Sequence, residues 1–354
     1  MTRPEITVMG AGIFGLTIAW VLSQRGALVQ VLDKRGLGAG ASGGPLGALA
    51  PHTPELWNTK KAVQLESLLM GPQFWAEVAE AAGQDTGYGR TGRLMPLAHD
   101  RAVAQAQDRA LFARDIWQGQ AVWEVIARPL SQWSPPSASG FVVYESLTAR
   151  IDPMSALTAL AKAITAQGGE VILGQKALSR KAKGSVIWAT GYEGLIEAGA
   201  DLGQSLGVGE KGQAMLLDFS APNNAPQLFV DGVHFVPHSN GTLAIGSTRE
   251  RYWEIADQPD HHLDALYQKA LTIFPFLKGA NVLKRWGAVR PRSNSRAPFL
   301  GAWPNREGHF MVNGGFKIGI AMAPRLAQMM ADLVLDEQDN VPHDLSVAAN
   351  FGPL

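Results

Sequence analysis

A glycine-rich turn near the start of the chain restricts the fold more than any other feature. Residues 6–9 form an apolar run that leads into Gly-Ala-Gly-Ile-Phe-Gly at positions 10–15 and then into an apolar helical pattern. A second apolar run at 28–32 ends at Asp33, and this acid lies about 20 residues beyond the turn. Strand, G-x-G-x-x-G turn, helix, strand and acid in this order predict a Rossmann-like βαβ unit that binds a dinucleotide.

Each residue of this motif has a physical role at a dinucleotide. Gly10 permits the tight turn, Gly12 lets the backbone approach a pyrophosphate, and Gly15 lets the helix pack closely against the strand. The phosphates then lie at the helix N-terminus, and Asp33 accepts hydrogen bonds from ribose hydroxyls. The same motif places three further residues at the cofactor: Ile13, Phe14 and Lys34.

A second stretch dense in glycine and small residues, positions 36–51, follows directly on the acid. Residues this small allow a loop to run close to a flat ring and to direct backbone N–H groups at phosphate or flavin acceptors. A flexible linker is the alternative, but linkers seldom contain apolar residues such as Leu46 and Pro51. We therefore predict a flavin cofactor. The contacts expected from this stretch are Ser42, Gly47, Ala48 and Leu49.

The middle of the chain alternates between short strands and amphipathic helices. Helices are predicted at 101–118, 260–274 and 323–335 from their composition and apolar spacing. Residues 90–98 predict a short strand, and Ser-Asn-Gly at 239–241 is typical of a hairpin turn. These signals indicate an antiparallel sheet outside the dinucleotide-binding unit.

Three later segments complete a pattern known from one enzyme family. The first runs from Ile-Asp-Pro at 151–153, through a helix at 156–166 and Gly-Gly-Glu-Val at 168–171, to a strand that ends in Ala-Thr-Gly at 189–191. The second combines Gly-Ala-Val-Arg-Pro at 287–291 with Pro-Phe-Leu-Gly at 298–301, and the third spans 313–324. In this order, the segments resemble the FAD-dependent amine and amino-acid oxidoreductases related to D-amino acid oxidase, most closely the glycine oxidases.

The resemblance implies an α/β fold with a Rossmann-like FAD-binding domain of the GR2 type and a second, antiparallel-sheet substrate domain. The FAD-binding domain is expected to be discontinuous, at 1–85, 145–211 and 288–354, with the substrate domain at 86–144 and 212–287. Val171 is implied to touch adenine, and Ala189, Thr190 and Gly191 to close over the cofactor. The segment beneath the flavin ring is implied to be Gly314, Gly315, Phe316, Lys317, Ile318, Gly319 and Ile320.

The implied activity is oxidation of the C–N bond of a small amino acid or secondary amine that carries a carboxylate, by hydride transfer to flavin N5. Arg290 is our first choice to hold that carboxylate, because a guanidinium grips it through two parallel hydrogen bonds; pairing with an acid in the sheet is the alternative. Lys317 is the second choice. His234 lies where relatives have a substrate-facing tyrosine, and an imidazole can titrate near neutrality.

Three departures from the family pattern leave other functions open. The family's His, Arg and acid are replaced by Gly315, Lys317 and Ser295. Positions 41–51 also resemble the flavin loop of the oxidase module that acts on the carboxymethylaminomethyl group of a tRNA wobble uridine. A stand-alone relative of that module and a catalytically degenerate flavin-binding subunit are therefore the alternatives.

Composition agrees with a soluble enzyme. Lys and Arg number 31, as do Asp and Glu, so no broad basic surface for nucleic acid is expected. The chain has no Cys, which excludes disulfides and a cysteinyl-flavin bond, and we expect noncovalent FAD. The scattered histidines predict no metal site. No membrane span or signal peptide is expected, and the predicted location is cytoplasmic. The oligomeric state and the electron acceptor are left open.

Overall fold

A parallel sheet forms the centre of the lobe that carries the glycine turn. In this computed structural model, which describes residues 3–351, six strands follow the order β15-β16-β9-β1-β2-β8. Neighbours from β16 to β8 run parallel, and β15 is antiparallel to β16. Val8, Val31 and Ile187 are fully buried, as expected for a parallel sheet covered on both faces. The strands are β1 (Glu5–Met9), β2 (Leu28–Asp33), β8 (Glu170–Leu173), β9 (Ser185–Trp188), β15 (Phe299–Ala302) and β16 (His309–Asn313).

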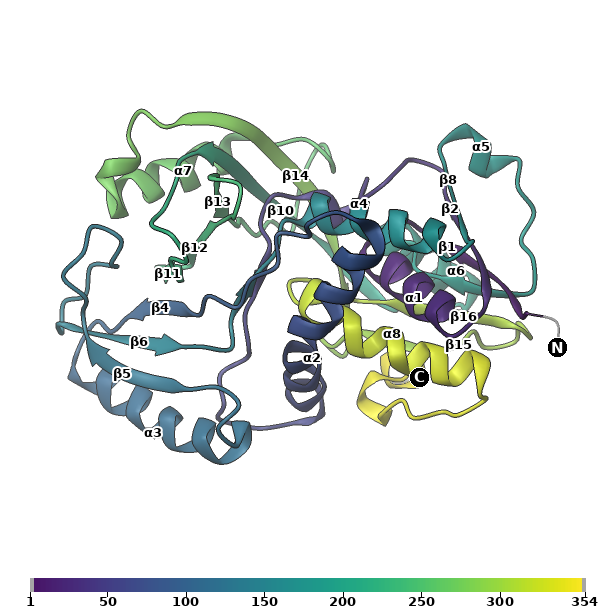
Figure 1. The fold of residues 1–354 in the computed structure, drawn as a ribbon, viewed down its shortest axis with the longest axis horizontal. Coiled ribbons are helices and arrows are strands. Elements are labelled where there is room, and N and C mark those ends of the chain that lie inside the picture. The colour runs from purple at the N-terminus through teal and green to yellow at the C-terminus, as the bar shows by residue number, and fades with distance from the viewer. Residues whose placement is uncertain (1–2, 352–354) are drawn as a thin grey trace.

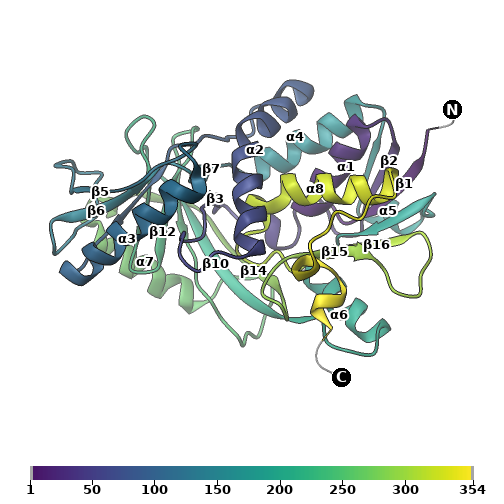
Figure 2. The ribbon, with the colours of Figure 1, turned by 90° about the horizontal axis from the view of Figure 1, so that it is seen from below.

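Helices cover both sides of this sheet. α1, α2, α4 and α8 pack against one another on one side, and α6 lies on the other (Figure 2). The side chain of Asp152 caps α4 by accepting from Met154 N and Ser155 N, and Pro153 occupies the first helical position. The helices are α1 (Ile13–Gln24), α2 (Thr59–Ala82), α4 (Pro153–Ala166), α5 (Gln175–Leu178), α6 (Gly191–Asp201) and α8 (Gly319–Leu335).

The second lobe is a twisted sheet of eight strands in the order β14-β10-β13-β12-β11-β4-β6-β5. Its strand pairs are antiparallel, as expected for this lobe, except β11 with β4, which run parallel. β11 comes much later in the sequence than β4, and it pairs with β4 in the same strand direction. The strands are β4 (Arg93–Pro96), β5 (Trp123–Ala127), β6 (Phe141–Glu145), β10 (Gly207–Asp218), β11 (Gln227–Val230), β12 (Val233–Pro237), β13 (Leu243–Gly246) and β14 (Asn281–Ser293).

Most of the helices and turns predicted in the middle of the chain are present. α3 (Asp100–Trp117), α7 (His261–Ile273) and the hairpin between β12 and β13 lie where the sequence placed them. α8 begins at Gly319, four residues before the predicted start, so that Pro324 lies inside the helix, where it cannot donate the i→i−4 backbone hydrogen bond. The short elements are β3 (Ala48–Leu49), β7 (Ala149–Arg150), η1 (Ala41–Gly43), η2 (Pro275–Leu277), η3 (His343–Leu345) and η4 (Ala348–Asn350).

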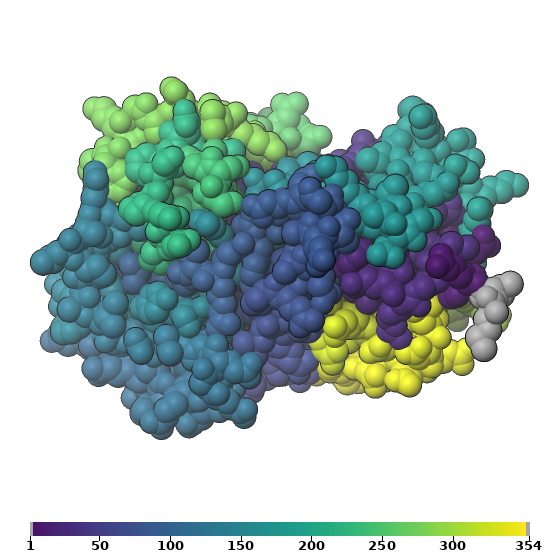
Figure 3. All heavy atoms as spheres, viewed as in Figure 1, coloured from purple at the N-terminus to yellow at the C-terminus, as the bar shows by residue number. Residues whose placement is uncertain are grey.

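The two lobes are joined by long strands rather than by linkers. β10 and β14 pair along most of their length and run from one lobe toward the other (Figure 1). α2 lies across the middle of the face drawn in Figure 3, between the lobes. The predicted domain boundaries near 211 and 287 fall inside these two strands, and the division into FAD-binding and substrate domains stays a proposal. Among the described residues, no helix is both long and apolar enough to span a bilayer.

Candidate active site

A cavity of about 710 Å³ lies where the two sheets meet. Residues from both lobes line it: the glycine turn and the end of β2 on one side, and β12, β14 and the segment before α8 on the other. Its size is in the range of cofactor and ligand sites. The cavity is therefore the place at which to test each site residue expected from the sequence.

The glycine turn has the geometry that its sequence predicts. Gly10 has φ +112°, and a Cβ there would lie 2.4 Å from the carbonyl oxygen of Ala189. A Cβ at Gly15 would lie 2.0 Å from Gly10 O, so only glycine lets α1 approach β1 this closely. Gly12 is the N-cap of α1 and has no side chain to cap it. Apart from Ile13 N, which donates to Ser42 Oγ, the positive end of α1 within the described residues has no side-chain acceptor and faces the cavity, as a pyrophosphate site requires.

Asp33 holds the turn as well as facing the cavity. Its Oδ2 accepts from Ala11 N at 2.9 Å, and its Oδ1 accepts from Arg35 N at 2.8 Å and Gly36 N at 3.0 Å. Lys34 and Arg35 form ion pairs with Glu193 of α6 at 3.2 and 2.9 Å. This end of the cavity offers a fixed carboxylate and a helix N-terminus, a donor and acceptor set that fits the nucleotide half of FAD.

The segment after Asp33 also lies against the cavity. Ser42 Oγ accepts from Ile13 N at 3.0 Å, which fixes the loop to the start of α1. The expected cofactor residues that line the cavity are Gly10, Gly12, Ile13, Phe14, Asp33, Lys34, Ser42, Ala48, Ala189, Thr190, Gly191, Gly315, Phe316, Lys317, Ile318, Gly319 and Ile320. Their contact with FAD stays a prediction.

The other five expected cofactor residues stand behind this lining. Gly15 and Gly47 permit close packing, since a Cβ at Gly47 would lie 1.8 Å from Ile151 O. Leu49 is buried, Gly314 forms a turn with φ +76°, and Val171 lies on β8 beside Val31 of β2. These residues support the wall of the cavity.

Arg290 projects from β14 into the cavity and is only 8% exposed. Its Nη1 donates to Ser247 Oγ at 3.1 Å, and its Nη2 donates to Thr248 O at 2.7 Å. Within residues 3–351, no carboxylate lies within ion-pair distance of Arg290. Glu210, which faces it across the β10–β14 ladder, pairs with Arg249 and Arg292 instead.

The charge on Arg290 is therefore buried among neutral partners. Burial lowers the pKa of Arg290 to about 10, although the nearby Glu250 and Glu210 act in the opposite direction. The guanidinium remains cationic at neutral pH. A buried cation without a direct counter-ion is a strong site for an incoming anion.

Lys317 lies beside Arg290, with an aromatic ring close to both. The Phe316 ring centroid is 5.6 Å from Arg290 Cζ and 5.8 Å from Lys317 Nζ. Phe316 N donates to Pro291 O at 3.0 Å, which ties this segment to β14. Burial lowers the pKa of Lys317, and the positive charges of Arg290 and Arg249 lower it further. The two predicted cations are thus brought together.

His234 lines the cavity but does not titrate near neutrality, which corrects that expectation. Burial lowers its pKa to about 3, with the charges of Arg93 and Lys317 adding to the effect. Its ring packs 4.4 Å from the ring of Phe229, and its Nδ1 is buried without a hydrogen bond. The imidazole is neutral at physiological pH. His234 forms part of the cavity wall, and its role toward a substrate stays a prediction.

The residues that depart from the family pattern have local explanations. A Cβ at Gly315 would lie 2.8 Å from Cζ of Phe14, so the space of a side chain is already taken. Ser295 lies in a turn outside the cavity lining, where its N–H donates to Asn350 Oδ1 at 3.2 Å. At positions 315 and 295, the residue present is therefore explained by its contacts within this chain.

Sequence reasoning missed several residues that line the cavity. Arg93 lies on β4, Phe229 on β11 and Trp286 on β14, and Ser247 directly follows β13. An arginine within a short, otherwise apolar strand was the one signal available for Arg93. The others carry no motif, because their place depends on how the strands pair.

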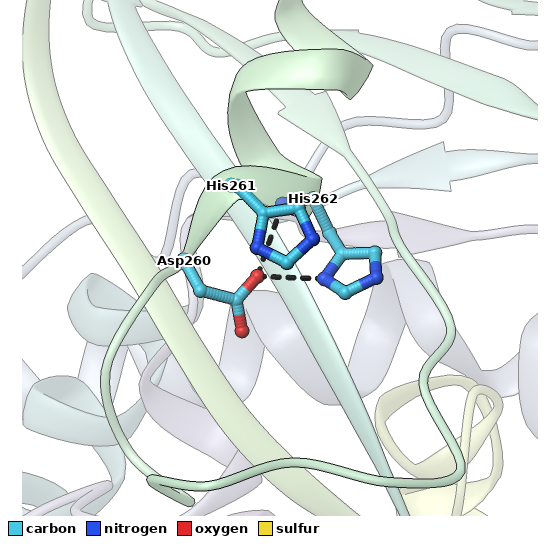
Figure 4. A group of neighbouring side chains, drawn as sticks. All are labelled: Asp260, His261 and His262. Atoms are coloured by element: carbon cyan, nitrogen blue, oxygen red, sulfur yellow. Dashed lines mark hydrogen bonds and ion pairs between the residues drawn. The ribbon is translucent and has the colours of Figure 1, made fainter.

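One group of side chains resembles a metal site but is explained by a helix cap. Asp260, His261 and His262 lie close together at the start of α7 (Figure 4). Asp260 Oδ2 accepts from Lys211 Nζ at 2.7 Å, and Oδ1 accepts from Gln213 Nε2 at 2.7 Å and His262 N at 3.0 Å. Burial raises the pKa of Asp260, but these hydrogen bonds outweigh it and keep the pKa low. The carboxylate is committed to the cap and to buried Lys211.

Comparison with known proteins agrees with the geometry. A protein-family model described as FAD dependent oxidoreductase (DAO) matches residues 5–333. Glycine oxidase of Geobacillus kaustophilus is 26% identical, across 97% of this chain and 96% of its own length. A bifunctional ThiO/ThiG protein of Trichormus variabilis is 25% identical across 96% of this chain, which spans about half (54%) of that protein.

The fold is shared with a solved structure. The crystal structure of glycine oxidase from Geobacillus kaustophilus aligns with a TM-score of 0.81, covering 99% of this chain and 100% of that one at 22% identity. The likeness of the fold therefore extends over both lobes.

Proposed function

Because this chain belongs to the FAD dependent oxidoreductase family, we propose that it oxidises the C–N bond of a small amino acid or secondary amine that carries a carboxylate. It is an FAD-binding oxidoreductase. The observation that carries the proposal is Arg290, a buried cation whose hydrogen-bond partners are a hydroxyl and backbone carbonyls, directed into the cavity. A substrate carboxylate supplies the counter-ion that Arg290 lacks.

The nucleotide half of FAD would be held by the N-terminus of α1, by Asp33 and by the loop around Ser42. FAD, when bound, supplies the hydride acceptor for the carbon that carries the amine. The chain's own residues position the substrate: Arg290 grips the carboxylate and Lys317 adds a second positive charge. His234 and Phe229 wall the cavity and limit the water that reaches it.

The site also limits which proton transfers its residues can perform. Arg290 stays protonated at neutral pH, and His234 stays neutral. Neither side chain accepts a proton from the substrate. Arg290 and His234 are therefore assigned to binding the substrate and to walling the cavity, not to proton removal.

The test is flavin reduction by a substrate panel. The purified protein is expected to be yellow, and acid precipitation should release FAD into the supernatant. Anaerobic stopped-flow mixing would then compare glycine, sarcosine, other N-alkyl amino acids and D-amino acids with matched amines that lack the carboxylate. Faster reduction by the carboxylate-bearing series supports the proposal. Faster reduction by the amines without a carboxylate would contradict the proposed amino-acid substrate. FAD that stays with the pellet would contradict noncovalent binding of the cofactor.

A further inference from the structure

A second arginine lines the same cavity at the far side of the eight-stranded sheet. Arg93, at the start of β4, is 6% exposed, and its Nε lies 3.0 Å from Glu145 Oε1. The Arg290 guanidinium reaches Ser247, which follows β13, and the Arg93 guanidinium lies beside Phe229 of β11. In the sheet order, β12 alone lies between β13 and β11. The two guanidinium groups thus mark the two ends of a short stretch of the wall that the sheet contributes.

Glu145 holds Arg93 in place without engaging its terminal amino groups. Glu145 is fully buried, and its Oε2 accepts from Leu147 N at 3.0 Å and Thr148 N at 2.9 Å. Its Oε1 accepts from the Thr148 hydroxyl and faces only Arg93 Nε. A purely structural pair would normally use the two-pronged geometry of a guanidinium. Within the described chain, neither Nη1 nor Nη2 of Arg93 has a hydrogen-bond partner.

The wall between the two arginines is continuous. The Phe229 ring centroid lies 5.9 Å from Arg93 Cζ, and His234 packs on that same ring. Ser247, which holds Arg290, closes the wall at the other end. Arg93 and Lys317 each lower the pKa of His234 by their charge, so both lie near this histidine. The path from Arg290 to Arg93 therefore runs along one apolar and neutral surface.

Charge is unevenly distributed along the cavity. Its acidic lining residues are Asp33, Glu193, Glu197 and Asp257. Asp33 serves the glycine turn, and Glu193 is paired with Lys34 and Arg35 at the nucleotide end. The substrate end has three cations, Arg93, Arg290 and Lys317. One carboxylate satisfies Arg290 and Lys317 but leaves the amino groups of Arg93 without a partner.

We propose that Arg93 binds a second carboxylate, so that the preferred substrate is an amine with a carboxylate at each end. The oxidation of such a substrate rests on the proposed function, whereas the binding of two carboxylates does not. Arg290 holds the carboxylate next to the reacting carbon, and Arg93 holds the distal one across the wall formed by Phe229 and His234.

The binding test uses oxidised holoprotein and ligands that do not react. Titrations followed by the flavin absorption spectrum would compare the dicarboxylates malonate, succinate, glutarate and adipate with monocarboxylates of matched length. We expect one dicarboxylate to bind at least about tenfold more tightly than its monocarboxylate partner, because a second charge-assisted pair forms. Equal affinities across every matched pair would overturn the proposal.

Variants then assign the effect to Arg93. Since Arg93→Met leaves buried Glu145 unpaired, the main variant is Arg93→Met with Glu145→Gln, which removes both charges. It should lose the dicarboxylate preference and retain monocarboxylate binding. Arg285→Met, which removes a guanidinium paired with Asp264 at the outside of β14, is the matched control and should keep the preference. A preference that survives in the double variant assigns the second carboxylate elsewhere and refutes the role of Arg93.

Turnover separates this inference from the proposed function. N-carboxyalkyl glycines are expected to reduce the flavin with a higher kcat/KM than N-alkyl glycines of equal length, and the double variant should remove that difference. If no amino acid reduces the flavin while the dicarboxylate preference is still present and depends on Arg93, the proposed reaction fails and the binding site stands. If N-alkyl glycines react well and no dicarboxylate effect appears, the reaction stands and the inference fails.

Discussion

Arg290 donates a hydrogen bond from Nη1 to the hydroxyl of Ser247 at 3.1 Å, immediately after the end of β13. This contact orients the guanidinium with a neutral partner and leaves its charge without a direct counter-ion. Burying an unpaired charge is costly in free energy. A substrate carboxylate would complete this charge, and this makes Arg290 the residue on which the proposed function most depends.

Replacing Arg290 with methionine should slow anaerobic flavin reduction by about 100-fold or more, because loss of the grip misplaces the reacting carbon. FAD should remain bound, since Arg290 lies away from the glycine turn. The reduction rate and the flavin content of Arg290→Met report the two effects separately. Arg285→Met, on the same strand, is the control. An unchanged reduction rate in Arg290→Met would show that Arg290 does not bind the substrate carboxylate.

Asp33→Ala should weaken FAD binding by about 1–3 kcal/mol, through loss of the acceptor for the ribose and of the three backbone donors that it now satisfies. The dissociation constant can be measured from flavin fluorescence on dilution. Asp115→Ala, an exposed acid on α3, is the matched control. If both variants keep the parent affinity, the dinucleotide fingerprint has been assigned to the wrong ligand.

The local half of the site could be predicted because its geometry is encoded by neighbours in sequence. The turn at Gly10, Gly12 and Gly15 depends on the strand before it and the helix after it, and the structure has both. Arg290 and Lys317 were also found, through segments whose order resembles a family. Their meeting across Phe316 was not predicted, since it depends on packing between β14 and the segment before α8.

The other half of the site depends on long-range pairing. Arg93 and Glu145 meet because β4 and β6 pair in one register, which no local pattern specifies. The pKa of His234 is set by burial beneath neighbouring strands and by two cations from different elements. Sequence alone therefore identified the residue but not the packing that sets its pKa.

Lys317 should give anion binding a pH dependence. Its pKa is lowered by burial and by the neighbouring charges of Arg290 and Arg249, so the side chain loses its proton at a lower pH than an ordinary lysine. Binding of a non-reacting monocarboxylate should therefore be strong below that lowered pKa and weaken as pH rises through it. Lys317→Arg should move the weakening to higher pH, because arginine keeps its charge.

The measurement for Lys317 is a flavin-spectrum titration with acetate at a series of pH values. Acetate is suitable because it carries no amine that titrates in the same range. Lys317→Met should bind acetate more weakly and remove the part of the pH dependence that comes from Lys317, leaving the loss of binding at about pH 10 where Arg290 titrates. The role of Lys317 would be contradicted by a step of the same size and midpoint in the parent and in Lys317→Met.

The contact between Phe14 and position 315 yields a prediction about stability. A Cβ at Gly315 would lie 2.8 Å from Phe14 Cζ, whereas a Cβ at Gly319 would meet the same ring at 3.8 Å, an ordinary contact. Gly315→Ala should therefore destabilise the protein by about 1–3 kcal/mol through overpacking, and Gly319→Ala should be tolerated. Thermal unfolding of the FAD-free proteins would measure both, so that flavin occupancy does not influence the result.

Phe14→Leu should relieve the clash, making Gly315→Ala less costly in the double variant than in the parent. Gly315→His, which introduces the residue implied by the family resemblance, should likewise destabilise the protein more in the parent than in the Phe14→Leu variant. Equal melting temperatures for Gly315→Ala and Gly319→Ala would show that Phe14 moves aside freely, and the absence of a side chain at position 315 would then need another cause.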